Sequence, residues 1–207
     1  MNLIDSIDIL QPDDWHVHLR EGEMMEAVVN HSSRFNHRCI VMPNLQYPIT
    51  TKKQGKEYIN TIKSMSTNLL FTPLLPCYLT DSLDINDFKE ALNEEIFIGA
   101  KLYPNNATTN SSYGISNFEK IYPIFDILQE LKKPLLIHGE KVRNDIEIFD
   151  REKIFIDEEL ISIRKNFPEL KIVLEHVSSK YGGDYVNENQ NIGATITPQH
   201  LMLTKKD

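Results

Sequence analysis

Seven short apolar runs recur along the chain, and longer segments with helical spacing separate most of them. The runs lie at residues 15–18, 39–42, 69–75, 98–102, 135–138, 172–176 and 194–197. Their lengths and β-branched residues are typical of buried parallel strands, which are apolar throughout instead of alternating with polar positions. Because strands that alternate with helices form βαβ units, the pattern predicts an α/β fold built on parallel strands.

The segments between the runs carry the spacing of amphipathic helices. Apolar residues recur on one face in 24–29 and in 58–65, and a third face spans 118–128, where Pro123 marks a helix start or a kink. No linker, low-complexity tract or repeat divides the sequence. Because 207 residues are enough for one well-buried core, we expect a single domain over residues 1–207.

Composition and charge narrow the possible functions. A chain with 41% hydrophobic and 25% charged residues is typical of a soluble globular protein, and its apolar runs are too short to cross a membrane. The acidic N-terminal segment lacks the features of a signal peptide, and Cys39 and Cys77 lie in apolar surroundings, as buried thiols do in a reducing compartment. We therefore expect a cytoplasmic protein. The net charge of −8 argues against a nucleic-acid partner, although one local arginine is enough to bind a small anionic substrate.

Four histidines and one lysine lie at or near the ends of the apolar runs: His16, His18, Lys101, His138 and His176. If the runs are parallel strands of one barrel, their carboxyl ends meet at the same mouth, so the five side chains converge there. Such a set describes a hydrolytic site with two metal ions. Taken one at a time, each histidine is equally compatible with an ordinary hydrogen-bonded residue in the core or at a strand end, so it is the joint pattern that favours metal.

The two kinds of ligand have separate physical arguments. His16 and His18 are two positions apart on a predicted strand, so both imidazoles project from the same face and can reach one ion. Lys101 follows apolar residues, and a buried ammonium is costly, so this lysine is paired, deprotonated, modified or extended toward solvent. A deprotonated amine can react with carbon dioxide to give a carbamate, whose two oxygens can bridge two metals.

A second group of residues is suited to bind a substrate. Arg20 is two positions beyond His18, so it is expected on the same side, where a guanidinium can hold a carboxylate in bidentate fashion. Asn44 ends the second run and can donate its amide to the same group; the alternatives are a surface ion pair for Arg20 and a turn for Asn44. The long polar loop over 103–114 is either a lid or a solvated connection. No ligand role is expected for the remaining histidines, His31, His37 and His200.

Several motifs, in order along the chain, resemble those of bacterial-type dihydroorotases of the amidohydrolase superfamily. They are WHVHLR, VMPNLQYPITT, FTPLLPCYLTDSLD, AKLYPNNATTNSS, HGE, EIFDRE, EHVSSK and ATITPQHLM. The resemblance implies a (β/α)8 TIM barrel that holds two zinc ions. It implies that His16 and His18 bind the first zinc, that N6-carboxylated Lys101 bridges both ions, and that His138 and His176 bind the second.

The resemblance also implies a reaction and a set of substrate contacts. The reaction is the reversible cyclisation of N-carbamoyl-L-aspartate to L-dihydroorotate in de novo pyrimidine synthesis, carried out by a homodimer. The implied substrate-binding residues are His18, Arg20, Asn44, Thr108, Thr109 and His138. Thr108 and Thr109 match the family's mobile loop, which closes over the substrate.

The sequence departs from the family at one point. The eighth strand of the family supplies an aspartate that completes the shell of the first zinc and moves the proton, and only a short segment follows the seventh run here. We therefore expect an incomplete barrel of about seven strands, truncated at its C-terminal side, with no catalytic residue assigned. Two alternatives stay open: another cyclic amidohydrolase, related to dihydropyrimidinase or allantoinase, and an inactive scaffold. Arg20 and Asn44 favour a substrate that carries a carboxylate.

Overall fold

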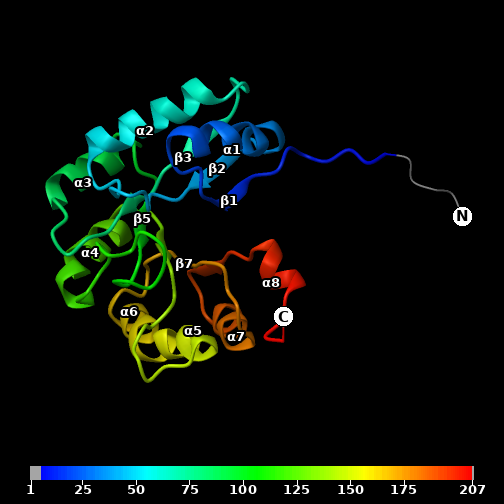
Figure 1. The fold of residues 1–207 in the computed structure, drawn as a ribbon. Coiled ribbons are helices and arrows are strands. Elements are labelled where there is room, and N and C mark those ends of the chain that lie inside the picture. Colours follow the sequence, from blue (N-terminus) through cyan, green and yellow to red (C-terminus); the bar gives the residue numbers. More distant parts are fainter. Residues whose placement is uncertain (1–5, 207) are drawn as a thin grey trace, which may run out of the picture.

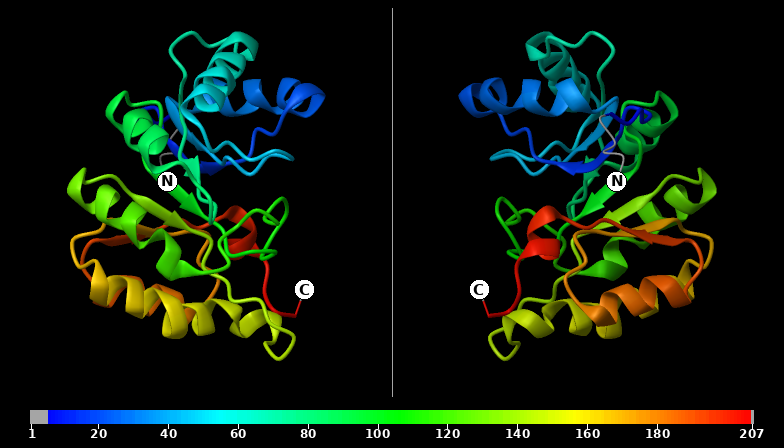
Figure 2. Two further views of the ribbon diagram at one scale, coloured as in Figure 1. Left: turned by 90° about the vertical axis from the view of Figure 1, so that its left-hand side faces the viewer. Right: turned by 90° about the vertical axis from the view of Figure 1, so that its right-hand side faces the viewer.

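The computed structural model describes residues 6–206, and its parallel strands form an arc with helices on the outside (Figure 1). Sequence-consecutive strands pair with each other, in a three-stranded and a five-stranded sheet. The first sheet contains β1 (Asp14–Val17), β2 (Arg38–Val41) and β3 (Thr72–Leu74). The second contains β4 (Cys77–Tyr78), β5 (Ala100–Leu102), β6 (Leu135–Ile137), β7 (Ile172–Leu174) and β8 (Ile192–Ala194). Figure 2 shows the two sheets one above the other.

The third and the seventh predicted strands differ from expectation. The third strand position of the arc is divided into two short strands, β3 and β4. Pro76, which has no N–H to donate, lies between them. The last strand was placed at 194–197, but it occupies 192–194, so that prediction was wrong in its bounds. The strand contains Gly193, which adds no apolar side chain to the run, and follows Asn191, whose φ of 57° starts it from a left-handed turn.

Helices α1 to α7 connect the strands and cover their outer side, whereas α8 follows the last strand and lines the cavity described below. They are α1 (Gly22–Phe35), α2 (Lys52–Met65), α3 (Ile85–Asn93), α4 (Tyr122–Glu130), α5 (Arg151–Phe155), α6 (Ile161–Asn166), α7 (Lys180–Glu188) and α8 (Pro198–Met202). A π-helical turn over Ile156–Leu160 joins α5 to α6. The predicted helix at 118–128 is a 3₁₀ turn over Phe118–Ile121 followed by α4, with Pro123 in the first turn, which confirms the proline as a start signal.

The core lies between the strands and the helices. The predicted apolar positions are confirmed in part: α1 buries Met25 and Val29 but leaves Met24 59% exposed, and α2 buries Tyr58 and Ile62. Both cysteines are buried and free. A second apolar cluster of Ile40, Met42 and Leu136 lies apart from this core. The strands are therefore packed on both faces, which explains why they read as continuous apolar runs.

The two ends of the arc are β1 and β8, each of which has a strand neighbour on one side only within residues 6–206. In the same part of the chain, no helix is long and apolar enough to cross a membrane. Because all the strand pairs are parallel, the carboxyl ends of the strands meet at one edge, and the connections that follow them gather there.

Candidate metal centre

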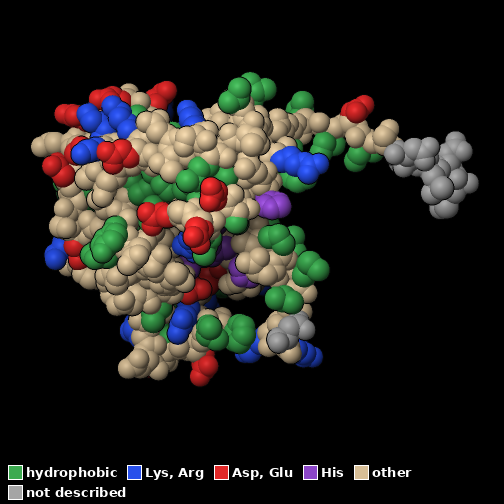
Figure 3. All heavy atoms as spheres, turned by 45° about the horizontal axis from the view of Figure 1, so that its top comes forward, with side chains coloured by type: hydrophobic (Ala, Val, Ile, Leu, Met, Phe, Trp, Pro, Cys, Tyr) green, Lys and Arg blue, Asp and Glu red, His purple; other side chains and the backbone are tan. Residues whose placement is uncertain are grey.

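The residues predicted at the strand ends converge on one cavity of about 780 Å³. His16 and His18 come from the end of β1, His138 from the end of β6 and His176 from the turn after β7, and all four line it. Lys101, in the middle of β5, is fully buried beside them. Figure 3 shows imidazoles, in purple, and acidic side chains, in red, within a hollow of the surface. The predicted convergence is confirmed.

The four imidazoles form two pairs. Nε2 of His16 lies 3.3 Å from Nε2 of His18, and Nδ1 of His138 lies 2.9 Å from Nε2 of His176. Two nitrogens that each bind one tetrahedral zinc ion at about 2.0–2.1 Å lie about 3.3 Å apart. The first pair has this spacing, and the second needs only a small separation to reach it.

The imidazoles are held in their neutral form. Burial first, and nearby positive groups second, lower the pKa of His16 and of His176 to about 2 and that of His18 to about 4. The pKa of His138 is also lowered, again mainly by burial. Neutral imidazole is the form that binds metal, because protonation removes the lone pair.

The charged form of Lys101 is disfavoured for the same reason. Burial lowers the pKa of this lysine well below its ordinary value. Its Nζ contacts Oε2 of Glu175, a carboxylate that is 1% exposed. Of the open alternatives for Lys101, extension toward solvent is therefore wrong, because the side chain is enclosed. A neutral amine is the nucleophile that carboxylation requires.

Glu175 is the residue of the site that the sequence analysis missed. On a regular strand Glu175 and His176 would point to opposite faces, so only one of them was expected in the site. The strand β7 ends at Leu174, and His176 has a φ of 43°, in the left-handed region. This turn lets both side chains reach the site. A usable signal was present: a carboxylate inside the apolar run KIVLEHV, next to a candidate ligand.

The rim of the cavity contains the predicted substrate-binding residues. Arg20 lines the cavity as expected, but not by strand alternation, because β1 ends at Val17 and Arg20 has a φ of 58°. Its Nη1 donates to the backbone oxygen of Asn44 at 3.1 Å, and Asn44 is 1% exposed. Arg20 therefore contacts a backbone oxygen, and Asn44 is a buried residue that follows β2.

The polar loop that follows β5 is held against Asn44. Thr108 and Thr109 line the cavity. The side-chain amide of Asn44 donates to the backbone oxygen of Thr109 at 3.0 Å, and the amide of Asn110 donates to the backbone oxygen of Asn44 at 3.0 Å. The hydroxyl of Tyr78 donates to the backbone oxygen of Asn110 at 3.2 Å. The loop thus lies where a lid would lie, fastened mainly through backbone atoms.

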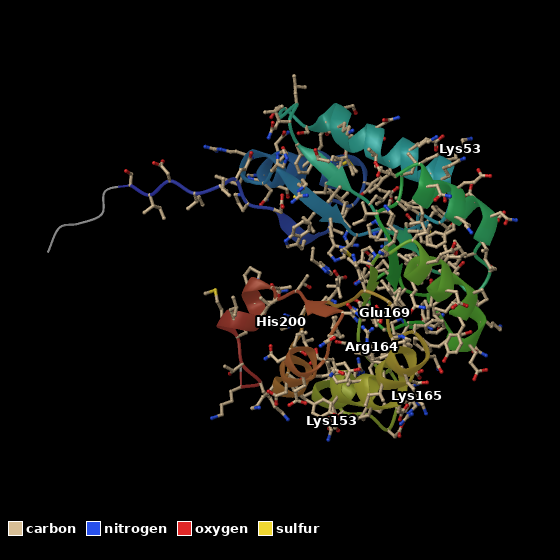
Figure 4. The ribbon with its side chains drawn as sticks, turned by 180° about the vertical axis from the view of Figure 1, so that it is seen from behind. Lys53, Lys153, Arg164, Lys165, Glu169 and His200 are labelled. Atoms are coloured by element: carbon tan, nitrogen blue, oxygen red, sulfur yellow. The ribbon has the colours of Figure 1, made fainter. Side chains whose placement is uncertain are left out.

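The other three histidines are outside the two pairs. His31 and His37 are exposed, as expected. His200, which is labelled in Figure 4, lies on α8. Its ring centre is 6.4 Å from that of His176. It lines the cavity but its Nδ1 is paired with the hydroxyl of Thr197 at 2.6 Å.

The donors fit metal ions only in combination. Within residues 6–206, no group of three or more His, Cys, Asp or Glu side chains is placed to hold one ion. Each imidazole pair supplies two nitrogens, and a third donor must come from elsewhere. Lys101 is the side chain whose carbamate would add an oxygen to each pair, and the chemistry of the donor set, nitrogen with oxygen, suits zinc. The residues therefore fit two ions that share a modified lysine.

No family model matches the chain, but curated proteins and solved structures are similar to it. A dihydroorotase from Yersinia enterocolitica is 48% identical over 202 residues, which are 97% of this chain and 58% of that protein. A dihydroorotase from Buchnera aphidicola is 44% identical over 207 residues, 99% of this chain and 59% of that protein. The chain thus spans less than two thirds of the length of these curated relatives.

Solved structures show the same relation. Dihydroorotase from Saccharomyces cerevisiae, in complex with 5-fluoroorotic acid, has a TM-score of 0.90 and 35% identity, covering 97% of this chain and 59% of that chain. Dihydroorotase from Campylobacter jejuni has a TM-score of 0.86 and 36% identity, covering 94% and 56%. An L-hydantoinase from Arthrobacter aurescens has a TM-score of 0.75 but 15% identity, over 95% of this chain and 49% of that chain, which shows the fold alone. The chain is related to dihydroorotases in sequence and fold, and it has part of the amidohydrolase-type barrel.

Proposed function

We propose that the chain carries the metal-binding half of a dihydroorotase site, for the reversible cyclisation of N-carbamoyl-L-aspartate to L-dihydroorotate in pyrimidine synthesis. The observation that carries the proposal is the pair of imidazole pairs around a buried lysine, with an arginine at the rim. Identities of 44–48% to dihydroorotases support this activity over the other cyclic amidohydrolases, whose likeness is one of fold. Arg20 supports it further, because a carboxylate-bearing substrate needs a cation.

The proposed metal centre uses the predicted ligands. His16 and His18 would hold one zinc ion, His138 and His176 would hold a second, and carboxylated Lys101 would supply oxygen donors. When bound, the two ions polarise a substrate carbonyl and lower the pKa of bound water. The chain prepares this centre by keeping its imidazoles neutral and by keeping Lys101 as an amine. The amine nitrogen bonds to the carbon of CO₂ and releases one proton, which leaves an anionic carbamate.

The proposed substrate contacts lie around the mouth of the cavity. The guanidinium of Arg20 and the second N–H of the Asn44 side-chain amide would hold the substrate carboxylate, since the first N–H donates to the backbone oxygen of Thr109. Thr108 and Thr109 from the loop line the same cavity as His18 and His138, and these four residues would add contacts to the substrate. No residue of the chain is assigned as the proton shuttle. A cytoplasmic location, a homodimer and the absence of nucleic-acid and membrane partners remain predictions.

The proposal is tested by turnover of L-dihydroorotate and N-carbamoyl-L-aspartate with added zinc and bicarbonate. Two proteins are compared: the chain itself, and the chain joined to the part of the Yersinia enterocolitica dihydroorotase that the match does not cover. Each is measured beside its Lys101→Ala variant. His31→Ala is the matched control, because it removes an exposed histidine outside the site.

The expected result is turnover by the joined protein that Lys101→Ala abolishes and His31→Ala leaves unchanged. Turnover by the chain alone would place the full activity within it. A joined protein that folds and binds zinc but does not turn over either compound would refute the proposed function. Turnover of a hydantoin in place of L-dihydroorotate would favour the other cyclic amidohydrolases.

A further inference from the structure

Glu175 is a buried carboxylate whose two oxygens face two different candidate ligands. Oε1 lies 3.1 Å from Nδ1 of His16, and Oε2 contacts Nζ of Lys101. The side chains of Glu175 and Lys101 are fully enclosed, and that of His16 is 11% exposed. This carboxylate, just after β7, therefore connects candidate ligands from β1 and β5, so that residues of three strands meet in one buried cluster.

The contact with His16 joins two atoms that have no other partner. Nδ1 of His16 and Oε1 of Glu175 are both buried, and neither has a well-aligned hydrogen bond. An unsatisfied buried polar atom destabilises the folded chain, so a small rotation that aligns this pair satisfies both atoms at once. With the proton on Nδ1, the lone pair of His16 is on Nε2, which faces Nε2 of His18 at 3.3 Å.

The contact with Lys101 is compatible with both chemical states of that lysine. A neutral amine has two N–H bonds, and one of them can point to Oε2. Carboxylation replaces one N–H by an N–C bond, and the carbamate nitrogen keeps the other. The same carboxylate oxygen can therefore accept a hydrogen bond before and after carboxylation, which fixes the direction of the Lys101 side chain.

We propose that Glu175 is the positioning residue of the metal centre, holding His16 by its Nδ1 and Lys101 by its nitrogen. This inference rests on the proposed function, because both partners are proposed metal ligands. A carboxylate behind a metal-binding histidine orients the ring, and its loss typically lowers metal affinity about 10–100-fold. In the pair of His138 and His176, the corresponding carboxylate is that of Glu140, which lies 3.5 Å from Nε2 of His138. Its side chain is 32% exposed, so we expect it to orient the ring less strongly. Loss of Glu175 should therefore weaken mainly the ion at His16 and His18.

The first test measures Co²⁺ binding by visible absorption, with bicarbonate present, in the parent chain, Glu175→Gln and Glu175→Asp. Asp87→Asn is the control, because it removes the same charge at a position that does not line the cavity. The carboxylate of Asp87 accepts a hydrogen bond from the backbone N–H of Lys52 at 2.7 Å. We expect Glu175→Gln to weaken one of two binding steps by at least about tenfold, with Glu175→Asp intermediate. Asp87→Asn should bind as the parent does. Equal binding by the parent and by Glu175→Gln would overturn the inference while leaving the metal centre intact.

The second test needs no metal. Nitrogen-15 NMR of the metal-free chain reports which nitrogen of His16 carries the proton. We expect the proton on Nδ1 in the parent and a mixture of both forms in Glu175→Gln. A parent chain with the proton on Nε2 would overturn the inference. If Glu175→Gln does not fold, the same measurement on Glu175→Asp tests the inference. That variant keeps the carboxylate but shortens the side chain by one methylene, which moves the carboxylate away from His16. A parent that shows the Nδ1 form but binds no Co²⁺ would refute the proposed metal centre instead.

Discussion

Glu152 allows a quantitative test of how the fold holds the segment after His176. Its buried carboxylate, on α5, accepts hydrogen bonds from the backbone N–H of Ser178 at 2.9 Å and of Ser179 at 3.1 Å. The hydroxyls of both serines also donate to it, at 3.2 Å and 2.5 Å. Ser179 in turn caps α7 by accepting from the N–H of Gly182. Glu152→Ala removes the acceptor from all four donors.

The expected loss follows from these bonds. A hydrogen bond to a charged group contributes about 1.5–3 kcal/mol, and the two backbone N–H groups cannot turn elsewhere. The hydroxyls can rotate toward water, and Ser178 is exposed, so we expect Glu152→Ala to lower the free energy of unfolding by about 3 kcal/mol. Glu152→Gln should lose about 2 kcal/mol, because its oxygen serves one serine while its NH₂ group faces the N–H of the other.

Urea unfolding followed by circular dichroism measures these differences, provided that the slope with denaturant is equal among the variants. Glu158→Ala is the control: this carboxylate lies in the helical segment that follows α5 and pairs with Arg143 at 2.9 Å, but it is 38% exposed. An exposed pair contributes at most about 1 kcal/mol. A loss of less than about 1 kcal/mol for Glu152→Ala would refute the reasoning, since it would mean that water replaces the carboxylate at little cost.

Three further outcomes are expected. Burial lowers the pKa values of the site histidines below 6.5, so the unfolded chain binds more protons than the folded chain in acid. The metal-free chain should therefore lose stability from about pH 6.5 downward. The loss should be up to about 1.4 kcal/mol per histidine per pH unit. A flat urea midpoint over that range would contradict this. Gly99→Ala should destabilise by more than about 2 kcal/mol, because its Cβ would lie 2.2 Å from a backbone oxygen, whereas Gly193→Ala, with nothing within 4 Å, should leave the melting temperature unchanged. Asn110→Ala should speed proteolysis of the loop after β5, and Asn106→Ala, at a position with the same left-handed backbone, should not.

The arrangement of the barrel could be predicted because its signals are local. A buried parallel strand needs apolar residues on both faces, so six of the seven predicted runs fall on the observed strand positions. The exception is β8, where Gly193 shortens the apolar run, so that its bounds were misplaced. The division at Pro76 depends on hydrogen-bond pairing with two different neighbours, which the sequence of a single strand does not encode.

The sequence predicts those site residues whose spacing along a strand determines the direction of their side chains. His16 and His18 share a face because they are two positions apart, and the cavity contains both. Arg20 reaches the same cavity for a different reason, a left-handed backbone that spacing does not reveal. Glu175 was missed because strand alternation directs it away from His176, and a single residue with a φ of 43° reverses that expectation.

The site also stands out by what it costs the fold. Most of the buried side-chain atoms that lack a hydrogen-bond partner in residues 6–206 belong to it, including those of His16, His18, Asn44, His138 and Glu175. Each such atom is expensive in a folded chain, at about 1–3 kcal/mol, and a core chosen for stability alone would contain apolar residues there. A ligand that binds only the folded state stabilises it and so offsets this cost, by an amount that increases with the affinity. The unpaired atoms include Nδ1 of His16 and of His18 and Nε2 of His138, so their concentration where four strands end marks this cavity as a site selected for binding and not for stability alone.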